Sequence, residues 1–190
     1  PDVCPTAAFE PDQLAWPRVV RRAFSDPRVP HESTGIDGRG TEEVKTNDVT
    51  GRVKAGEVGF TIEFGRPGVG VWMREIQDMC WTLAKAGVDF ETRNPITSLM
   101  KDRATGTLRE DILNEKLMSA IIEIKVPISR TEEIICLVKD VEKRIDTVVA
   151  LDMLEDGARS LRRMLPEDIS IVVERELGPG VSPHVRVDAS

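Results

Sequence analysis

The sequence predicts an α+β fold in which two amphipathic helices cover one face of an antiparallel sheet. From position 58 onward, the spacing of apolar residues alternates between strand-like and helix-like periods in the order βαββαβ. Turn residues separate these segments, and an apolar helix stripe needs another element against which it can be buried. We therefore expect an irregular proline- and glycine-rich arm at 1–57, an α/β sandwich at 58–154, and a C-terminal extension and tail at 155–190.

The first strand and the first helix have the clearest patterns. Apolar residues alternate along the predicted strand, which places Val58, Phe60, Ile62 and Phe64 on one face. The helix that follows has apolar residues three and four positions apart, namely Met73, Ile76, Cys80 and Leu83. Gly87 stands where a left-handed residue commonly ends a helix.

The middle of the chain predicts two further strands around an ambiguous segment. A strand is expected at 88–92, with a break at Asn94-Pro95 and a possible continuation at 96–100. A turn follows at 101–106, in which Gly106 is expected to be left-handed. The segment 107–114 fits either a hairpin return or a short helix, and 117–126 is expected to be the third strand.

The second helix and the last strand of the sandwich complete the order. Ser129 and Glu132 have the spacing of a capping box, which predicts the start of a helix. Its apolar stripe is Ile134, Ile135, Val138, Val141 and Ile145. The apolar run at 147–153 predicts a buried strand.

The two ends of the chain predict little regular structure. Prolines recur through the arm, which leaves room for one short helix at 18–24 and otherwise predicts a long loop. The extension is expected to form a helix at 154–165 and a strand at 169–174, followed by a loose end that contains His184. The helix-free sheet face would be covered by the arm and the tail or by a second copy of the chain.

Composition excludes several classes of protein. Lys and Arg total 26 against 33 Asp and Glu, a formal charge of -7, and this acidic balance disfavours nucleic-acid binding. No apolar run is long enough to predict a membrane span, and no signal peptide is recognisable, so a cytoplasmic location is expected. The three scattered cysteines predict no disulfide framework. With only two histidines, no catalytic or zinc-binding constellation is visible, and we expect no cofactor in this chain itself.

A glycine-rich turn between the first strand and the first helix is the candidate ligand site. It consists of Gly65, Arg66, Pro67, Gly68, Val69 and Gly70. The first amides of a helix lack internal partners, and the helix dipole is positive there, so a carboxylate or phosphate is favoured. Arg66 would add a positive charge. The alternative is a plain tight turn, and the spacing matches neither of the common nucleotide-binding glycine motifs.

The segment 58–90 resembles ACT-type regulatory domains. The resemblance rests on Pro67-Gly68 and on Leu83-Ala84-Lys85-Ala86-Gly87-Val88. It implies a ferredoxin-like βαββαβ sandwich that binds a small molecule, often an amino acid, near the turn and at the interface of a homodimer. The acidic residue that usually precedes the Pro-Gly pair is absent, and Gly65-Arg66 stands there instead.

The segment 2–9 resembles the end of a bacterial ferredoxin motif, in which the last cysteine of a cluster run precedes proline. The resemblance implies that Cys4 would ligate a [4Fe–4S] cluster if a cluster domain lay upstream. The upstream cysteines of the motif are absent, and the alternative is that Cys4 is a free thiol.

Three functions remain open from the sequence. The first is a regulatory domain that binds a small molecule at the 65–70 turn. The second is an accessory domain of an iron–sulfur protein. The third is a structural or assembly subunit whose arm, residues 1–57, wraps a partner subunit.

Overall fold

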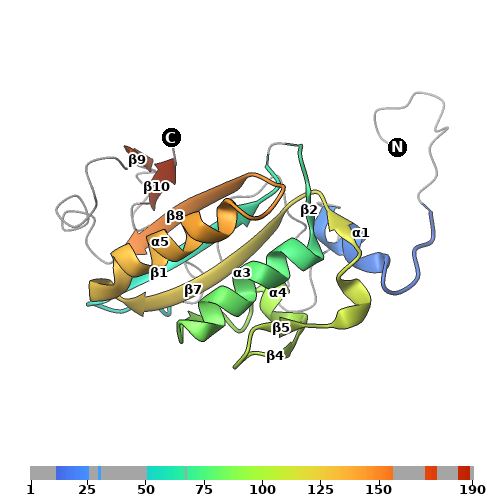
Figure 1. Ribbon diagram of the computed structural model, residues 1–190, viewed down its shortest axis with the longest axis horizontal. Coiled ribbons are helices and arrows are strands. Elements are labelled where there is room, and N and C mark those ends of the chain that lie inside the picture. The colour runs from blue at the N-terminus through green and yellow to red at the C-terminus, as the bar shows by residue number, and fades with distance from the viewer. Residues whose placement is uncertain are drawn as a thin grey trace.

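The structure is a computed structural model that describes residues 12–25, 30, 51–66, 68–155, 170–174 and 184–188. It confirms a mixed α and β fold with an antiparallel sheet. Six strands form this sheet in the order β3-β7-β1-β8-β10-β9, and two long helices, α3 and α5, run across it (Figure 1). Two shorter ladders, β2 with β6 and β4 with β5, lie outside the main sheet.

The centre of the sheet is formed by β1 (Glu57–Phe64) and β7 (Ala120–Pro127), which pair along their whole length. β8 (Val149–Glu155) pairs with the other edge of β1, and the short β3 (Asp89–Phe90) pairs with β7. The predicted strands at 58–64, 88–92 and 147–153 are therefore present, with boundaries that differ by a few residues. The strand predicted at 117–126 begins at Ala120 instead, because β6 (Lys116–Leu117) pairs with β2 (Val71–Trp72).

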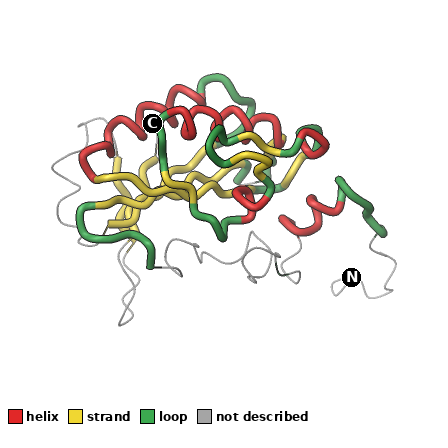
Figure 2. Tube along the Cα trace, turned by 90° about the horizontal axis from the view of Figure 1, so that it is seen from below, coloured by secondary structure: helices red, strands yellow, loops and turns green. Residues whose placement is uncertain are grey.

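The core lies between the sheet and the two long helices. α3 (Met73–Lys85) and α5 (Thr131–Glu142) lie on the same side of the sheet (Figure 2). The predicted apolar stripe of α3 is fully buried, as are the sheet residues that face it; they include Met73, Ile76, Cys80, Leu83, Phe60, Ile62, Ile122 and Ile124. At about 25 cal/mol per Å² of apolar surface removed from water, this layer is the main source of stability.

The predicted start of the second helix was wrong in detail. A 3-10 turn, η2 (Ile128–Arg130), precedes α5, and Ser129 makes no cap. The Thr131 hydroxyl instead donates to the carbonyl of Ile128 at 2.7 Å. The end of α3 agrees with the prediction, since Gly87 has a left-handed φ of 69°.

The segment after β3 forms a helix where a strand was predicted. α4 (Pro95–Ser98) replaces the strand continuation expected at 96–100. The Asn94 side chain accepts a hydrogen bond from the Ile96 amide at 2.9 Å, and Pro95 occupies the first turn, so the local sequence caps a helix.

The segment 107–114 combines both structures that its sequence allowed. β4 (Met100–Asp102) and β5 (Thr107–Leu108) form a hairpin, and the 3-10 helix η1 (Glu110–Ile112) follows it.

The short helix predicted in the arm is present as α1 (Val19–Ser25), which buries Val20 and Phe24. Its Arg21 forms an ion pair with Glu115, beside β6. The Trp16 indole donates to Asp111 at 2.6 Å, and hydrogen bonds from Arg109 and Trp16 lower the pKa of Asp111 to about 2. The other residues between 1 and 50 lie outside the described part of the chain, apart from 12–18 and 30.

The C-terminal extension continues the main sheet. β9 (Ser170–Glu174) matches the strand predicted at 169–174, and it pairs with β10 (His184–Asp188), which pairs with β8. The prediction that His184 belongs to a loose end was wrong, because β10 occupies the position between β8 and β9. The helix predicted at 154–165 was wrong at its start, because Leu154 and Glu155 belong to β8, and its remainder lies outside the described residues. Within the described ranges, no helix has the length and apolar character needed to cross a membrane.

Candidate ligand-binding loop

The 65–70 turn folds back on itself at the end of β1. Gly65, Gly68 and Gly70 have positive φ values of 83°, 73° and 74°. The amides of Val69 and Gly70 donate to the Gly65 carbonyl at 3.1 and 3.0 Å, and the Gly65 amide donates to the Val148 carbonyl at 3.0 Å. The turn is therefore held closed and tied to the segment that enters β8. Pro67 lies outside the described residues.

The three described glycines of this turn differ in how much space surrounds them. A Cβ atom on Gly65 would lie 2.8 Å from the Met118 carbonyl oxygen, and one on Gly70 would lie 2.8 Å from that of Leu117. A Cβ atom on Gly68 would meet nothing within 4 Å.

We therefore expect alanine at position 65 or 70 to lower the free energy of unfolding by about 2–4 kcal/mol. Gly68→Ala should cost only about 1 kcal/mol, because its penalty is backbone strain alone. Urea denaturation of the three single variants checks this order. Equal losses at all three positions would contradict the close packing of the turn against 117–118.

Three backbone amides at the start of α3 already have acceptors within the protein. β2 separates the turn from the helix, and the Trp72 amide donates to the Glu75 carboxylate at 2.9 Å. The Met73 amide donates to the Glu115 carbonyl at 3.0 Å, and the Arg74 amide donates to the Leu113 carbonyl at 3.2 Å. An anion at the helix N-terminus would have to displace these protein acceptors, so any ligand at the turn depends mainly on Arg66.

Arg66 extends from the turn toward the face of the sheet opposite the long helices. Its Nη1 atom is 3.9 Å from Oε2 of Glu63, a residue of β1 that alternates with the core residues Ile62 and Phe64. Its Nη2 atom is buried and has no hydrogen-bond partner among the described residues. About a third of the Arg66 side chain remains exposed, while its buried Nη2 atom leaves the guanidinium incompletely hydrogen-bonded.

The sheet face that contains Glu63 is polar and buried, which the sequence analysis did not foresee. Thr61, Glu63 and Glu123 are all less than a tenth exposed, and the Asn94 amide donates to Glu123 at 2.7 Å. Thr61 lies opposite Glu123 in β7 and opposite Asp152 in β8. Alternating glutamates in a strand usually indicate a solvated face, and only the alignment of these polar positions across β1, β7 and β8 reveals the cluster.

The cysteines in the described part provide no cluster site. Cys80 is buried in α3, and burial raises the pKa of its thiol, whereas Cys136 is exposed on α5. Among the described residues, no group of three or more His, Cys, Asp or Glu side chains is arranged to hold a metal ion. Cys4 lies outside those residues, so its role remains a prediction from sequence.

Comparison with known proteins gave no match to a family model, to a curated protein or to a solved structure.

Proposed function

We propose that this chain is a regulatory domain that binds a small carboxylate, such as an amino acid, through Arg66 at the 65–70 turn. The observation that carries this proposal is the buried Nη2 atom of Arg66, which has no hydrogen-bond partner in the described part of the chain. A guanidinium has five N–H donors and binds a carboxylate through two parallel hydrogen bonds. A buried donor without an acceptor is costly, and a ligand carboxylate would supply that acceptor.

Glu63 favours an amino acid over a simple carboxylate. Its carboxylate lies beside the Arg66 guanidinium, so one positive and one negative group stand close together at the turn. An α-amino acid has the complementary pair of charges at similar spacing. Glu63 also makes a further interaction in the protein, so an ammonium group would share this carboxylate with its existing partners.

The strand order supports a ferredoxin-like arrangement for the domain. The four strands β3-β7-β1-β8 are antiparallel neighbours, with α3 between β1 and β3 in the chain and α5 between β7 and β8. We infer a βαββαβ sandwich to which β10 and β9 add two strands beyond β8. In this arrangement the 65–70 turn is the first connection between a strand and a helix.

Calorimetric titration of the purified chain with the standard amino acids tests the proposal. We expect at least one to bind, and Arg66→Ala should weaken that binding by about ten- to a hundredfold because a charge-assisted pair is lost. Arg66→Lys should restore part of the affinity. Replacement of Glu63 by Gln should weaken the binding of the amino acid more than the binding of its deaminated analogue.

Arg103→Ala is the matched control, because Arg103 is an exposed arginine in the β4–β5 turn. Its affinity should equal that of the unmodified chain. An amino acid that binds Arg66→Ala as tightly as the unmodified chain would remove Arg66 from the site. A lack of binding by all amino acids and small carboxylates would contradict the proposed function itself.

A further inference from the structure

A second surface lies at the β2–β6 ladder, beside the turn. Trp72 is directly opposite Lys116, while the neighbouring pair Val71 and Leu117 is buried. Because side chains alternate along a strand, Trp72, Lys116 and Met118 share the outward face of the ladder. We call this face, together with Arg74 and Val69, the Trp72 patch.

Two cations surround the indole of this patch. The Arg74 guanidinium lies 4.3 Å from the Trp72 ring centroid, and the Lys116 ammonium lies 5.9 Å from it. Neither cation forms an ion pair with a carboxylate in the described part of the chain, although most of the other basic side chains near the helices do. Those paired residues include Arg21, Arg109, Arg130 and Arg144.

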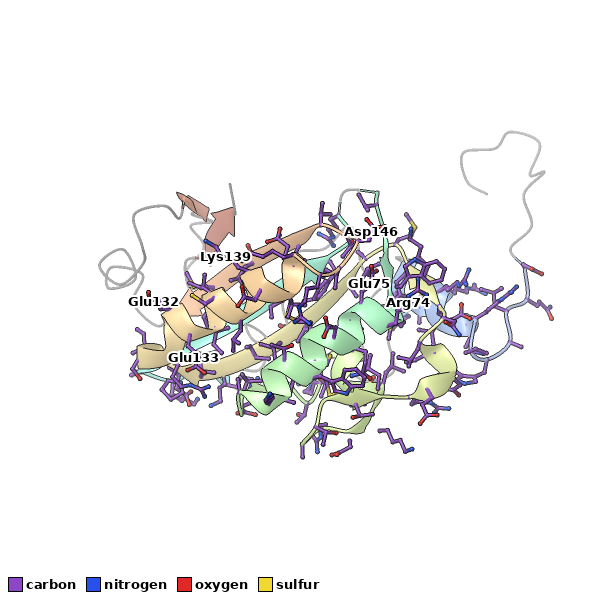
Figure 3. All side chains as sticks on the ribbon, viewed as in Figure 1. Arg74, Glu75, Glu132, Glu133, Lys139 and Asp146 are labelled. Atoms are coloured by element: carbon purple, nitrogen blue, oxygen red, sulfur yellow. The ribbon has the colours of Figure 1, made fainter. Side chains whose placement is uncertain are left out.

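The acidic groups nearest to the patch are partly engaged elsewhere. Glu75 accepts hydrogen bonds from the backbone amides of Trp72 and Asp146, and Glu115 pairs with Arg21. Figure 3 shows Arg74, Glu75 and Asp146 at one end of the helix layer, far from Glu132 and Glu133. Asp146 is exposed at the same end of the helix layer, and Arg74 and Lys116 are the two cations over the ring that form no ion pair among the described residues.

Exposed apolar side chains adjoin these cations. Met118 is 64% exposed and Val69 is 45% exposed, which are among the highest values for large apolar residues in the described chain. Gly70 lies opposite Met118 if the register of the ladder is continued, and it has no side chain to cover this surface; a Cβ there would meet Leu117 and the Lys116 stem. Met118, Val69 and the edge of Trp72 therefore offer apolar contact area beside two positive charges.

We propose that the Trp72 patch docks a short acidic segment of a partner protein. Carboxylates of the segment would contact Arg74 and Lys116, and one apolar side chain would pack on Met118 and Val69. A chain of net charge -7 with only two free cations at this site is a poor match for a polyanion such as nucleic acid or an anionic membrane. A short peptide needs only this local charge complementarity.

An array of immobilised octapeptides, graded in acidic charge and in leucine content, tests the proposal with the labelled full chain. We expect preference for peptides that combine two or more glutamates with a leucine. The double variant Arg74→Ala/Lys116→Ala should lose at least about tenfold in affinity for the best soluble peptide. Met118→Ala should reduce the increase in affinity that a leucine in the peptide provides, and it should leave the preference for glutamate unchanged.

The control is the double variant Lys101→Ala/Arg103→Ala, which removes two exposed cations from the β4–β5 hairpin and should bind like the unmodified chain. Amino-acid binding at Arg66 is measured in parallel and should not change in the Arg74/Lys116 variant. Failure of the docking proposal can therefore be distinguished from failure of the ligand-binding proposal. The docking proposal is overturned if that variant keeps its affinity or if the array shows no preference for acidic peptides. It is also overturned if a DNA duplex or phosphatidylserine vesicles bind the patch more tightly than every peptide.

Discussion

Replacement of Gly106 by alanine is expected to lower the free energy of unfolding by at least about 3 kcal/mol, which combines overpacking with backbone strain. Gly106 has a φ of 71°, and a Cβ atom there would lie 2.3 Å from the carbonyl oxygen of Cys80 in α3. That oxygen belongs to the helix backbone, so no side-chain rotation can relieve the contact. The β4–β5 hairpin would have to move away from α3.

Gly87→Ala is the matched control for this prediction. Gly87 has nearly the same φ, 69°, but a Cβ atom there would meet nothing within 4 Å. Its cost should be about 1 kcal/mol, since only the left-handed backbone is penalised. Urea denaturation of both variants measures the difference. Similar losses for the two glycines would mean that the hairpin does not lie as close to α3 as the structure indicates.

Replacement of Gln77 by methionine is expected to cost about 2–4 kcal/mol, because two buried backbone groups lose their partners. Gln77 is 2% exposed, and its side-chain nitrogen donates to the Gly106 carbonyl at 2.7 Å. Its side-chain oxygen accepts from the Leu108 amide at 2.6 Å. Methionine has a similar volume and similar helix propensity, so the loss would report the two hydrogen bonds.

Lys85→Met on the same helix is the control for this substitution. Lys85 is exposed in the last turn of α3, and its replacement should change stability by less than about 0.5 kcal/mol. Hydrogen exchange adds a local test, since the Leu108 amide should lose protection in the Gln77 variant. A stable Gln77→Met variant with full protection at Leu108 would show that the side chain does not fasten the hairpin.

The ligand turn and the Trp72 patch lie close together and share Val69, but the charged side chains assigned to each are different. The turn contacts the end of β6 through Gly65 and Gly70, and the patch is formed by the outward residues of β2 and β6. The separate Arg66 and Arg74/Lys116 variants therefore divide ligand binding from partner docking. The Arg74/Lys116 variant also tests an assembly role of the kind that the sequence left open. The sequence suggested the arm, residues 1–57, as the surface for that role, whereas this variant tests the Trp72 patch.

The sequence was most informative where a structure depends on neighbours along the chain. The period of two at 58–64 and the helical stripe from Met73 to Leu83 predicted β1 and α3, because both are fixed by local backbone geometry. Gly87 and Gly106 were predicted to be left-handed for the same reason, and both are. The antiparallel sheet with helices on one side followed from the order of these elements.

Tertiary structure decided the features that depend on residues distant in the chain. The two-residue strands β2 and β6 are too short to have a period, and they exist only because 71–72 meets 116–117. β10 likewise forms by pairing with β8 on one side and β9 on the other, and no local pattern in the sequence reveals these pairings. The amides at the start of α3 are occupied by carbonyls from 113 and 115, which changed the candidate site from a helix terminus to Arg66. Local sequence determined the elements of this protein, whereas pairings across many residues determined which polar groups remain available to a ligand or a partner.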